Sequence, residues 1–216
     1  MRLALLVLLT ACLVPSAQAA ADVPYADFSG VYLGIQTDYA AGGGSDWCSC
    51  TPASFFADAT GGEGGFIAGA HAGIDWRWGP LVVEGETRLS YADVSFAETC
   101  GSRRCAGELQ WLAEAHVGLG LVFGNYMILA QSGYAAGDVQ ALSDAFAPTT
   151  APATSIHDGR VHGARIDYAM SGNWRMAVEY RYYDMSGEND IPGGGAIDIE
   201  WIAHVGGLRM TYEVGE

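Results

Sequence analysis

The chain has 216 residues, enough for one domain of ordinary size, and its formal net charge at pH 7 is −15. Such acidity disfavours binding to nucleic acid and plain electrostatic docking on anionic lipid. Beyond the N-terminus, no apolar run approaches the roughly 20 residues that a transmembrane helix needs.

The N-terminal stretch MRLALLVLLTACLVPSAQA is typical of a secretory signal, with an early arginine, an apolar core and a cleavage motif at Ala17–Ala19. We predict that residues 1–19 are removed and that residues 20–216 form a single domain. A second interpretation stays open, because the letters LTAC also resemble a lipoprotein processing box, in which Cys12 would carry a lipid.

After the signal, the chain alternates apolar and polar residues with a period of two, which is typical of half-buried β-strands. In the first half, the pattern runs through FSGVYLGIQTDY, FIAGAHAGIDWRW, LVVEGETRLSY and ELQWLAEAHVGLGLVF. In the second half, GRVHGARIDYA and WRMAVEYRYYD follow it closely, and YMILAQSGYAA and WIAHVGGLRMTY follow it less cleanly. We predict eight strands, at approximately 28–39, 65–78, 81–92, 108–123, 126–138, 159–169, 174–184 and 198–212.

The connections between the strands alternate in length. Three are short, namely GP at 79–80, GN at 124–125 and AMSGN at 169–173. The others are long and rich in glycine and small residues, at roughly 40–63, 93–107, 139–159 and 185–196. An even number of strands with alternating short and long connections predicts an antiparallel up-and-down barrel.

The apolar face of each strand is predicted to point outward, into lipid. The opposite face holds mostly glycine and charges of both signs, which suit a crowded interior better than a hydrated exterior. Aromatic residues gather at both ends of the apolar face, as in the girdles of a barrel in a bilayer. The alternative is a soluble lipocalin-like barrel, whose apolar face points inward. We predict an all-β transmembrane antiparallel β-barrel with short periplasmic turns and long extracellular loops. The predicted girdle residues are Trp76, Trp78, Tyr91, Trp111, Phe123, Tyr126, Tyr134, Tyr168, Trp174, Tyr182 and Tyr212.

The segments GVYLGIQ, GFIAGAHAGIDWRWGPLVVEGETRLSYADV, GNWRMAVEYRYYDMSG and GLRMTY resemble the opacity-protein-like, eight-stranded surface proteins of Gram-negative bacteria, often labelled "porin family". The resemblance covers about residues 28–212 and rests on the order and spacing of these segments. It implies a location in the outer membrane, insertion by the barrel-assembly machinery, and no catalysis.

The polar faces are predicted to form a charge network in the lumen, because an eight-stranded barrel is just wide enough to be filled by side chains. Charges withdrawn from water are costly unless they are paired, and acids and arginines nearly balance here. His71 and Asp75 look like half of a catalytic site, but four residues along a strand span about 13 Å, too far for a hydrogen bond. The predicted lumenal residues are His71, Asp75, Arg77, Glu84, Glu86, Arg88, Glu108, Glu114, His116, Arg165, Asp167, Arg175, Glu179, Arg181 and Arg209.

Turn geometry predicts which of these charges face each other. If the GP turn pairs Trp78 with Leu81, His71 lies opposite Arg88 and Asp75 lies opposite Glu84. Two facing acids are tolerable only if an arginine such as Arg77 lies between them or one acid holds a proton. If the five-residue turn pairs Tyr168 with Trp174, Asp167 faces Arg175.

Two further residue groups point to other chemistry. Ser155, His157 and Asp158, with His162 nearby, form the one cluster that suits an enzyme acting on lipid, but these residue types carry no specific spacing. The cysteines that remain after cleavage suggest disulfides in an oxidising compartment, and their spacing lacks the C-x2-C pattern of a zinc site. These cysteines are Cys48, Cys50, Cys100 and Cys105.

We therefore predict a structural or surface protein of the outer membrane, acting in envelope integrity, as a surface antigen or in adhesion. A narrow small-solute channel is the alternative, and an outer-leaflet lipid-modifying enzyme is a more distant one. We predict no cofactor and no metal, and a monomer in contact with outer-membrane lipid and lipopolysaccharide. Arg103 and Arg104 form a basic spot that suits lipopolysaccharide phosphates. The sequence does not identify an extracellular ligand.

Overall fold

The computed structural model describes residues 26–41, 45–49, 64–100, 103–143, 153–170, 172–191 and 195–214. The signal predicted at 1–19 lies outside these residues, as does Cys12. Within them, all regular secondary structure is strand, and no helix is long and apolar enough to cross a membrane.

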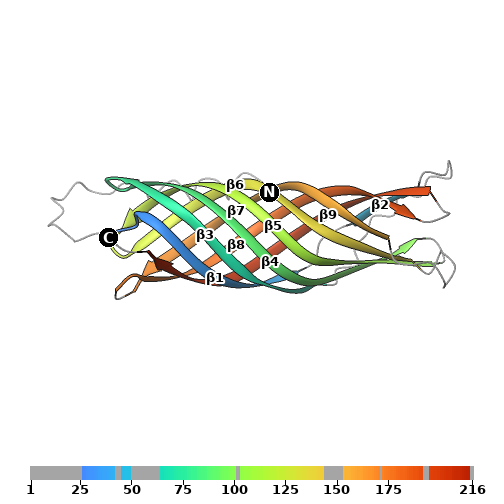
Figure 1. Ribbon diagram of the computed structural model, residues 1–216, viewed down its shortest axis with the longest axis horizontal. Coiled ribbons are helices and arrows are strands. Elements are labelled where there is room, and N and C mark those ends of the chain that lie inside the picture. Colours follow the sequence, from blue (N-terminus) through green and yellow to red (C-terminus); the bar gives the residue numbers. More distant parts are fainter. Residues whose placement is uncertain are drawn as a thin grey trace, which may run out of the picture.

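The strands form one closed antiparallel barrel, which Figure 1 shows from the side with its long axis horizontal. β1 pairs with β3, each strand from β3 to β8 pairs with the next one in the chain, and β1 closes the barrel by pairing with β9. The short β2 pairs with the same strand just beyond the end of β1, so together they occupy one of eight positions, as predicted. The bounds are β1 Gly30–Ala41, β2 Ser45–Ser49, β3 Gly65–Trp78, β4 Leu81–Cys100, β5 Arg103–Phe123, β6 Tyr126–Ser143, β7 Ala153–Ala169, β8 Trp174–Ile191 and β9 Gly195–Glu213.

Glycines with positive φ make the short turns, which lie together at the end of the barrel on the left of Figure 1. Gly79 and Gly124 have a φ of 60° and stand first in their two-residue turns, while no other residue type in the described part has positive φ. A glycine in the first central position is the pattern of a type II′ turn, whose twist matches that of the flanking strands.

The register at the two-residue turns is the predicted one. Trp78 pairs with Leu81, which sets His71 opposite Arg88 and Asp75 opposite Glu84. The prediction for the third turn was wrong.

At that third turn, Tyr168 pairs with Met176 and not with Trp174. Asp167 consequently faces Ala177, and Arg175 faces Ala169. The amide of Met170 donates to the carbonyl of Trp174 across 2.8 Å, so backbone bonding continues two residues beyond Tyr168 before the chain turns. A slip of two residues keeps every side chain on its predicted face, so the alternation alone could not reveal it.

The strands run beyond the predicted bounds at the end opposite the short turns. The segment 93–107, predicted to be a long loop, is strand up to Cys100 in β4 and from Arg103 in β5. The same happens in β6 and β7, which extend to Ser143 and begin at Ala153. The barrel is therefore longer than a membrane-spanning band requires.

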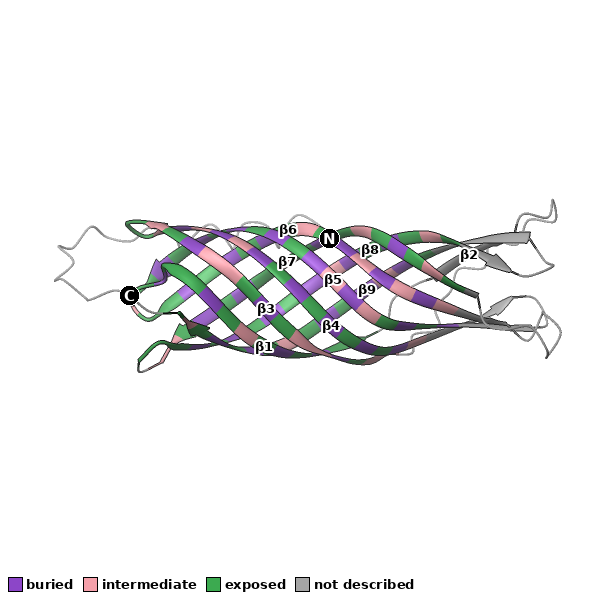
Figure 2. Cartoon of the chain, in the orientation of Figure 1, coloured by how far each residue is buried: buried purple, intermediate pink, exposed green. Residues whose placement is uncertain are grey.

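Buried and exposed residues alternate along the strands (Figure 2), and the chemical character of the two faces inverts along the barrel axis. Near the short turns, large apolar residues such as Val117 and Leu119 are exposed on the outside, and charged residues are buried. Near the other end, the buried residues form an apolar cluster that includes Ile67, Leu109 and Trp201. Many outward positions there are polar, such as Asp93, Glu108 and Asp158, although exposed aromatic rings such as Tyr91 lie among them.

A β-bulge carries β5 through this inversion and corrects one predicted site residue. The register shifts between Leu109 and Trp111, and Gln110 and Trp111 both lie on the outer side. Beyond the bulge, Leu109 is therefore buried and Glu108 is exposed. Glu108 was predicted to be one of the lumenal charges, and that prediction is wrong.

Candidate functional site

The charged residues inside the barrel form the candidate functional site. Of the predicted lumenal residues, all except Arg77 and Glu108 are buried. Among the described residues, the buried charges comprise seven carboxylates and five guanidinium groups. The carboxylates belong to Asp38, Asp75, Glu84, Glu86, Glu114, Asp167 and Glu179, and the guanidinium groups to Arg88, Arg165, Arg175, Arg181 and Arg209.

Glu86 in β4 accepts hydrogen bonds from three side chains, one on β4 itself and the others on β1 and β9. Arg209 donates to its two oxygens across 2.6 and 3.1 Å, and the Arg88 Nε donates across 2.5 Å. The Tyr32 hydroxyl adds a bond of 2.7 Å. Charge-assisted bonds of this kind are stronger than neutral ones, so the β1, β4 and β9 walls are tied together across the lumen.

Glu179 in β8 is a second centre. Both terminal nitrogens of Arg88 donate to it, across 2.6 and 3.0 Å, in the two-pronged geometry that suits arginine and carboxylate. Gln131 donates to the same carboxylate. Arg209 lies 3.7 Å away, which links this centre to the first.

Arg181 extends the network toward β1 and β5. Its guanidinium donates to Glu114 across 2.7 and 3.0 Å, and it also donates to Asp38. His116 lies 2.7 Å from the other side of Glu114, through its Nε2. All four side chains are buried, so each depends on these partners in place of water.

Two arginines from the far wall separate the facing acids Asp75 and Glu84. Arg175 donates to Asp75 across 2.7 Å, and its guanidinium lies 4.3 Å from the centre of the Tyr32 ring. Arg165 donates both terminal nitrogens to Glu84, and its Nε donates to Asp167 across 2.6 Å. Arginines therefore do pair with both acids, but Arg77, which the sequence offered as an example, is not one of them.

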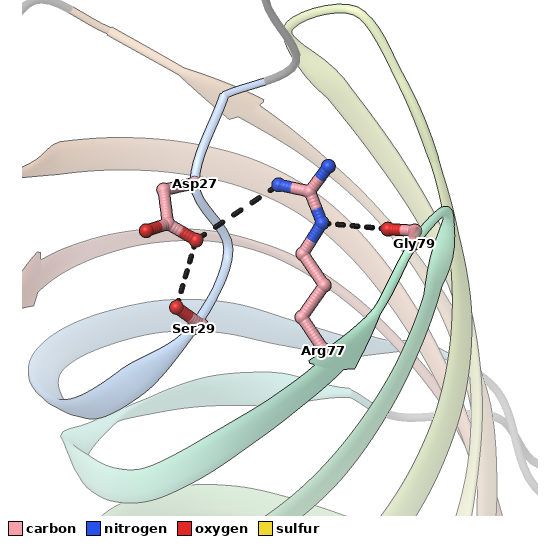
Figure 3. A pocket seen from close by; sticks show the side chains of 4 residues that line it. All are labelled: Asp27, Ser29, Arg77 and Gly79. Carbon is pink, nitrogen blue, oxygen red and sulfur yellow. Dashed lines mark hydrogen bonds and ion pairs between the residues drawn. The ribbon is translucent and has the colours of Figure 1, made fainter.

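Arg77 lies instead at the rim, in a shallow depression beside the short turns (Figure 3). Its guanidinium donates to the carbonyls of Gly79 and Ala26, across 2.7 and 2.5 Å, and lies 3.9 Å from the exposed Asp27 carboxylate. Its role in the structure is to hold the segment before β1 against the β3–β4 turn.

The uncharged residues Gln36, Ser90 and Thr211 complete the network around His71 and were not predicted as site residues. His71 bonds Gln36 across 2.7 Å and Thr211 across 2.9 Å, and Gln36 in turn donates to Ser90 across 3.1 Å. Gln36 lies on the polar face that the alternation of the first strand predicts, and so does the missed acid Asp38. Their strand position was available from the sequence, but their partners on distant strands were not.

Apolar layers lie above and below the charges. Toward the short turns, Phe28, Val82, Val122, Met127 and Leu129 form one buried cluster. Toward the other end lies the larger cluster of Ile67, Leu109, Trp201 and their neighbours. The side chains of Arg88, Arg165 and Glu86 lie between these layers with 0% exposure to bulk solvent.

The cluster that suggested an enzyme is not assembled. His157 is fully buried and points inward, whereas Asp158 is exposed on the outer face. The Ser155 hydroxyl donates to the carbonyl of Glu188 across 2.6 Å. His162 lies outside, next to Ser132. Alternation along β7 places His157 on the inner face and Asp158 and His162 on the outer face, so the cluster does not converge.

The predicted disulfides lie outside what the structure describes. Cys50 is not among the described residues, and neither are the side chains of Cys48, Cys100 and Cys105. The same holds for the side chains of Arg103 and Arg104.

The predicted aromatic girdles lie on the outer wall. Near the short turns, Tyr126 and Tyr168 are in ring contact at 4.9 Å, as are Trp174 and Tyr212 at 5.0 Å. Toward the other end, Tyr91 and Tyr134 are exposed, whereas Trp111 and Tyr182 are half-buried. Exposed aromatic rings at both ends of an apolar band are the pattern of a barrel in a bilayer. The remaining predicted girdle residues, Trp76, Trp78 and Phe123, are exposed as well.

Two curated relatives are similar to this chain over most of its length. They are 31 kDa outer-membrane immunogenic proteins of Brucella melitensis and Brucella suis, each 28% identical over 190 residues, covering 81% of this chain and 78% of the relative. No family model matches the chain.

Several solved structures are also similar at low identity. OprG from Pseudomonas aeruginosa has a TM-score of 0.47 at 10% identity, covering 86% of this chain and 97% of its own. Neisserial surface protein A has a TM-score of 0.42 at 16% identity, covering 84% and 96%. Ail of Yersinia pestis, solved in complex with the heparin analogue sucrose octasulfate, has a TM-score of 0.38 at 13% identity, covering 83% and 99%.

The barrel, its apolar outer band and its curated relatives agree on one location. The chain is an eight-stranded β-barrel protein of the bacterial outer membrane, as the resemblance to the opacity-like surface barrels implies.

Proposed function

We propose that this outer-membrane barrel is a non-conducting, non-catalytic surface protein that serves envelope integrity and presents its outward end for interaction. The observation that carries the proposal is the closed lumen, in which paired charges lie between two apolar layers. A barrel of eight strands has an interior that side chains can fill, and here they do so at 0% exposure in the middle of the network.

The pairing of the lumenal charges also argues against a narrow channel. A conducting pore needs charges that face water and release an ion after binding it. Here Arg88, Arg165 and Arg181 each donate to two different carboxylates. An ion entering the lumen would have to displace these bonds and cross the apolar layers as well.

The outward end supports a role at the cell surface. There the strands run beyond the apolar band, and acidic residues such as Asp93, Asp184 and Glu200 point outward into water. The Brucella relatives are named immunogenic proteins, which suits surface display of the equivalent end in this chain. Surface antigen and adhesion functions both use such an end.

Insertion by the barrel-assembly machinery and existence as a monomer belong to the same proposal. The closing strand β9 pairs with both β8 and β1, and Tyr212 near its end is an aromatic residue of the kind that this machinery reads in similar barrels. Closure within one chain leaves no open edge among the eight positions, so a partner chain is not needed to satisfy the backbone.

Planar-bilayer recording tests the proposal directly. The purified barrel, refolded into lipid, should give no conductance steps above those of the bare bilayer, while a general porin in the same set-up gives clear steps. Slower gel migration after boiling confirms that the inserted protein was folded. Reproducible conductance steps from a folded, inserted sample would overturn the proposal and favour a small-solute channel.

A further inference from the structure

Polar side chains face outward on one side of the barrel, at a height where the other side is apolar. Ser132, His162, Tyr182 and His204 are neighbours in one cross-strand row over β6, β7, β8 and β9. Ser132, His162 and His204 are exposed on the outer wall, and Tyr182 is half-buried. Together with Arg160 and Tyr180 these residues are called the outer-wall patch below.

The outer-wall patch lies in the outer part of the apolar band. His162 is six residues above Tyr168 of the lower girdle, and His204 is eight residues above Tyr212. At about 3.3 Å per residue and a tilt of about 40°, these separations correspond to roughly 15–20 Å along the membrane normal. The apolar band of such barrels is about 25 Å tall, so the patch lies near the boundary with the outer-leaflet headgroups.

Among the residues that the structure describes, the opposite wall has no equivalent polar row at this height. Val117, six residues above Phe123, is 67% exposed, and Leu89, eight residues above Leu81, is 65% exposed. Polar groups that face hydrocarbon cost free energy. Their presence on one side of the barrel only therefore indicates a local function for that side.

The hydrogen bonds within the outer-wall patch leave it rich in donors. Tyr180 and His204 bond through the hydroxyl and Nδ1 at 2.6 Å, and Ser132 and His162 do so at 3.0 Å. With the hydroxyl donating to Nδ1, the neutral imidazole carries its proton on Nε2 and still offers one N–H. Each pair therefore presents an unused donor, and no carboxylate lies within the row itself.

Arg160 adds a positive charge to this set of donors. Among the residues whose side chains are described, it is the one arginine on the outer wall above the rim. Asp184 lies directly opposite Arg160 on β8, two residues from Tyr182 of the row. A guanidinium has five N–H donors, so one neighbouring carboxylate leaves others available.

We propose that the outer-wall patch binds a phosphate group of an outer-leaflet glycolipid, the phosphorylated lipid A portion of lipopolysaccharide. Its phosphate lies at the height of the patch, its oxygens accept hydrogen bonds, and its acyl chains continue down the apolar wall below Tyr180. The protein as a whole is strongly acidic, so a phosphate finds its favourable contacts here through local donors and not through net charge. This inference extends the proposed function and does not depend on whether the lumen conducts.

Binding to defined lipids tests the site. The folded barrel in detergent is titrated with bisphosphorylated lipid A and with the same lipid after removal of both phosphates, and binding is followed by native mass spectrometry. We expect the phosphorylated lipid to bind at least about tenfold more tightly, because each charge-assisted bond lost is worth about that factor. Inorganic phosphate at millimolar concentration should not compete, since it lacks the acyl chains. Equal affinity for the two lipids, or complete displacement by inorganic phosphate, would overturn the proposal.

Variants locate the site on the barrel. The triple variant Arg160→Gln, His162→Gln, His204→Gln should lose the preference for the phosphorylated lipid. Arg77→Gln removes the same charge from the opposite rim and should keep that preference. If the triple variant does not fold, Arg160→Gln alone carries the same expectation with a smaller loss. If the triple variant and Arg160→Gln both fold and both keep the preference for the phosphorylated lipid, the phosphate binds elsewhere and the proposal is wrong.

Discussion

Arg165 lies against three carboxylates of the charge network, so a single substitution there removes several buried ion pairs. Its guanidinium bonds Glu84 with both terminal nitrogens, bonds Asp167 across 2.6 Å and lies 3.7 Å from Glu86, with no side-chain exposure at either end. Arg165→Met keeps most of the volume but leaves these carboxylates without their shared cation. Removing one partner of a buried ion pair typically costs about 3–5 kcal/mol. We therefore expect the folding equilibrium constant to fall by roughly two to four orders of magnitude.

Denaturant unfolding in lipid vesicles measures this cost. Tryptophan fluorescence follows the transition, and the difference in gel migration between heated and unheated samples reports the folded fraction. Arg160→Met is the matched control, because the same substitution on the same strand removes an exposed guanidinium from the outer wall. Exposed ion pairs contribute about 1 kcal/mol or less, so the control should stay near the wild type.

A rescue separates loss of charge pairing from loss of packing. In the triple variant Arg165→Met, Glu84→Gln, Asp167→Asn, the isolated carboxylates become neutral amides, and most of the lost stability should return. If Arg165→Met unfolds at the same denaturant concentration as the control, the network does not stabilise the barrel and the reasoning is refuted. If the triple variant is no better than the single one, the cost came from packing.

Three further outcomes follow from single positions, each measured by the same unfolding assay. Tyr32→Phe removes the 2.7 Å bond to Glu86 and should lower the free energy of unfolding by about 1.5–3 kcal/mol; an unchanged value would mean that the hydroxyl is replaced by other donors. Glu108→Gln should change it by less than about 0.5 kcal/mol because Glu108 is exposed, whereas Glu114→Gln in the network should cost clearly more. Leu119→Arg places a charge in the lipid-facing band and should cost about 2–4 kcal/mol, with Leu119→Met as a nearly neutral control.

The fold followed from the sequence because alternation and turn chemistry act over short distances. His71 and Arg88 could be placed opposite each other since a two-residue turn fixes the register of both strands it joins. The outward direction of the apolar face could also be predicted, because residues such as Trp76 and Trp78 end that face in aromatic rings.

The details that escaped prediction depend on positions with no local signal. Nothing in the letters around Gln110 indicates a bulge, yet the bulge moves Glu108 to the outer wall. The five-residue turn accepts two registers of equal parity, so Asp167 could not be assigned its partner. Asp38 was recognisably on a polar face, but its bond to Arg181 joins residues 143 positions apart. Such contacts are set by barrel closure, which period-two patterns do not encode.

The inner and outer faces of the strands exchange their polar and apolar character along the barrel axis, and this limits where a ligand can contact the protein. In the lower part of the barrel, charged residues face the lumen and apolar residues face outward, as contact with lipid requires. In the upper part, an apolar cluster fills the lumen and many outward residues are polar. The upper apolar cluster, which includes Leu112, Met185 and Trp201, closes the lumen above the charges and stiffens strands that have left the band. A ligand approaching from outside therefore meets either the upper rim or the outer wall, and not the network. The charges hold the eight positions in register, and recognition is left to the surfaces that face lipid and water.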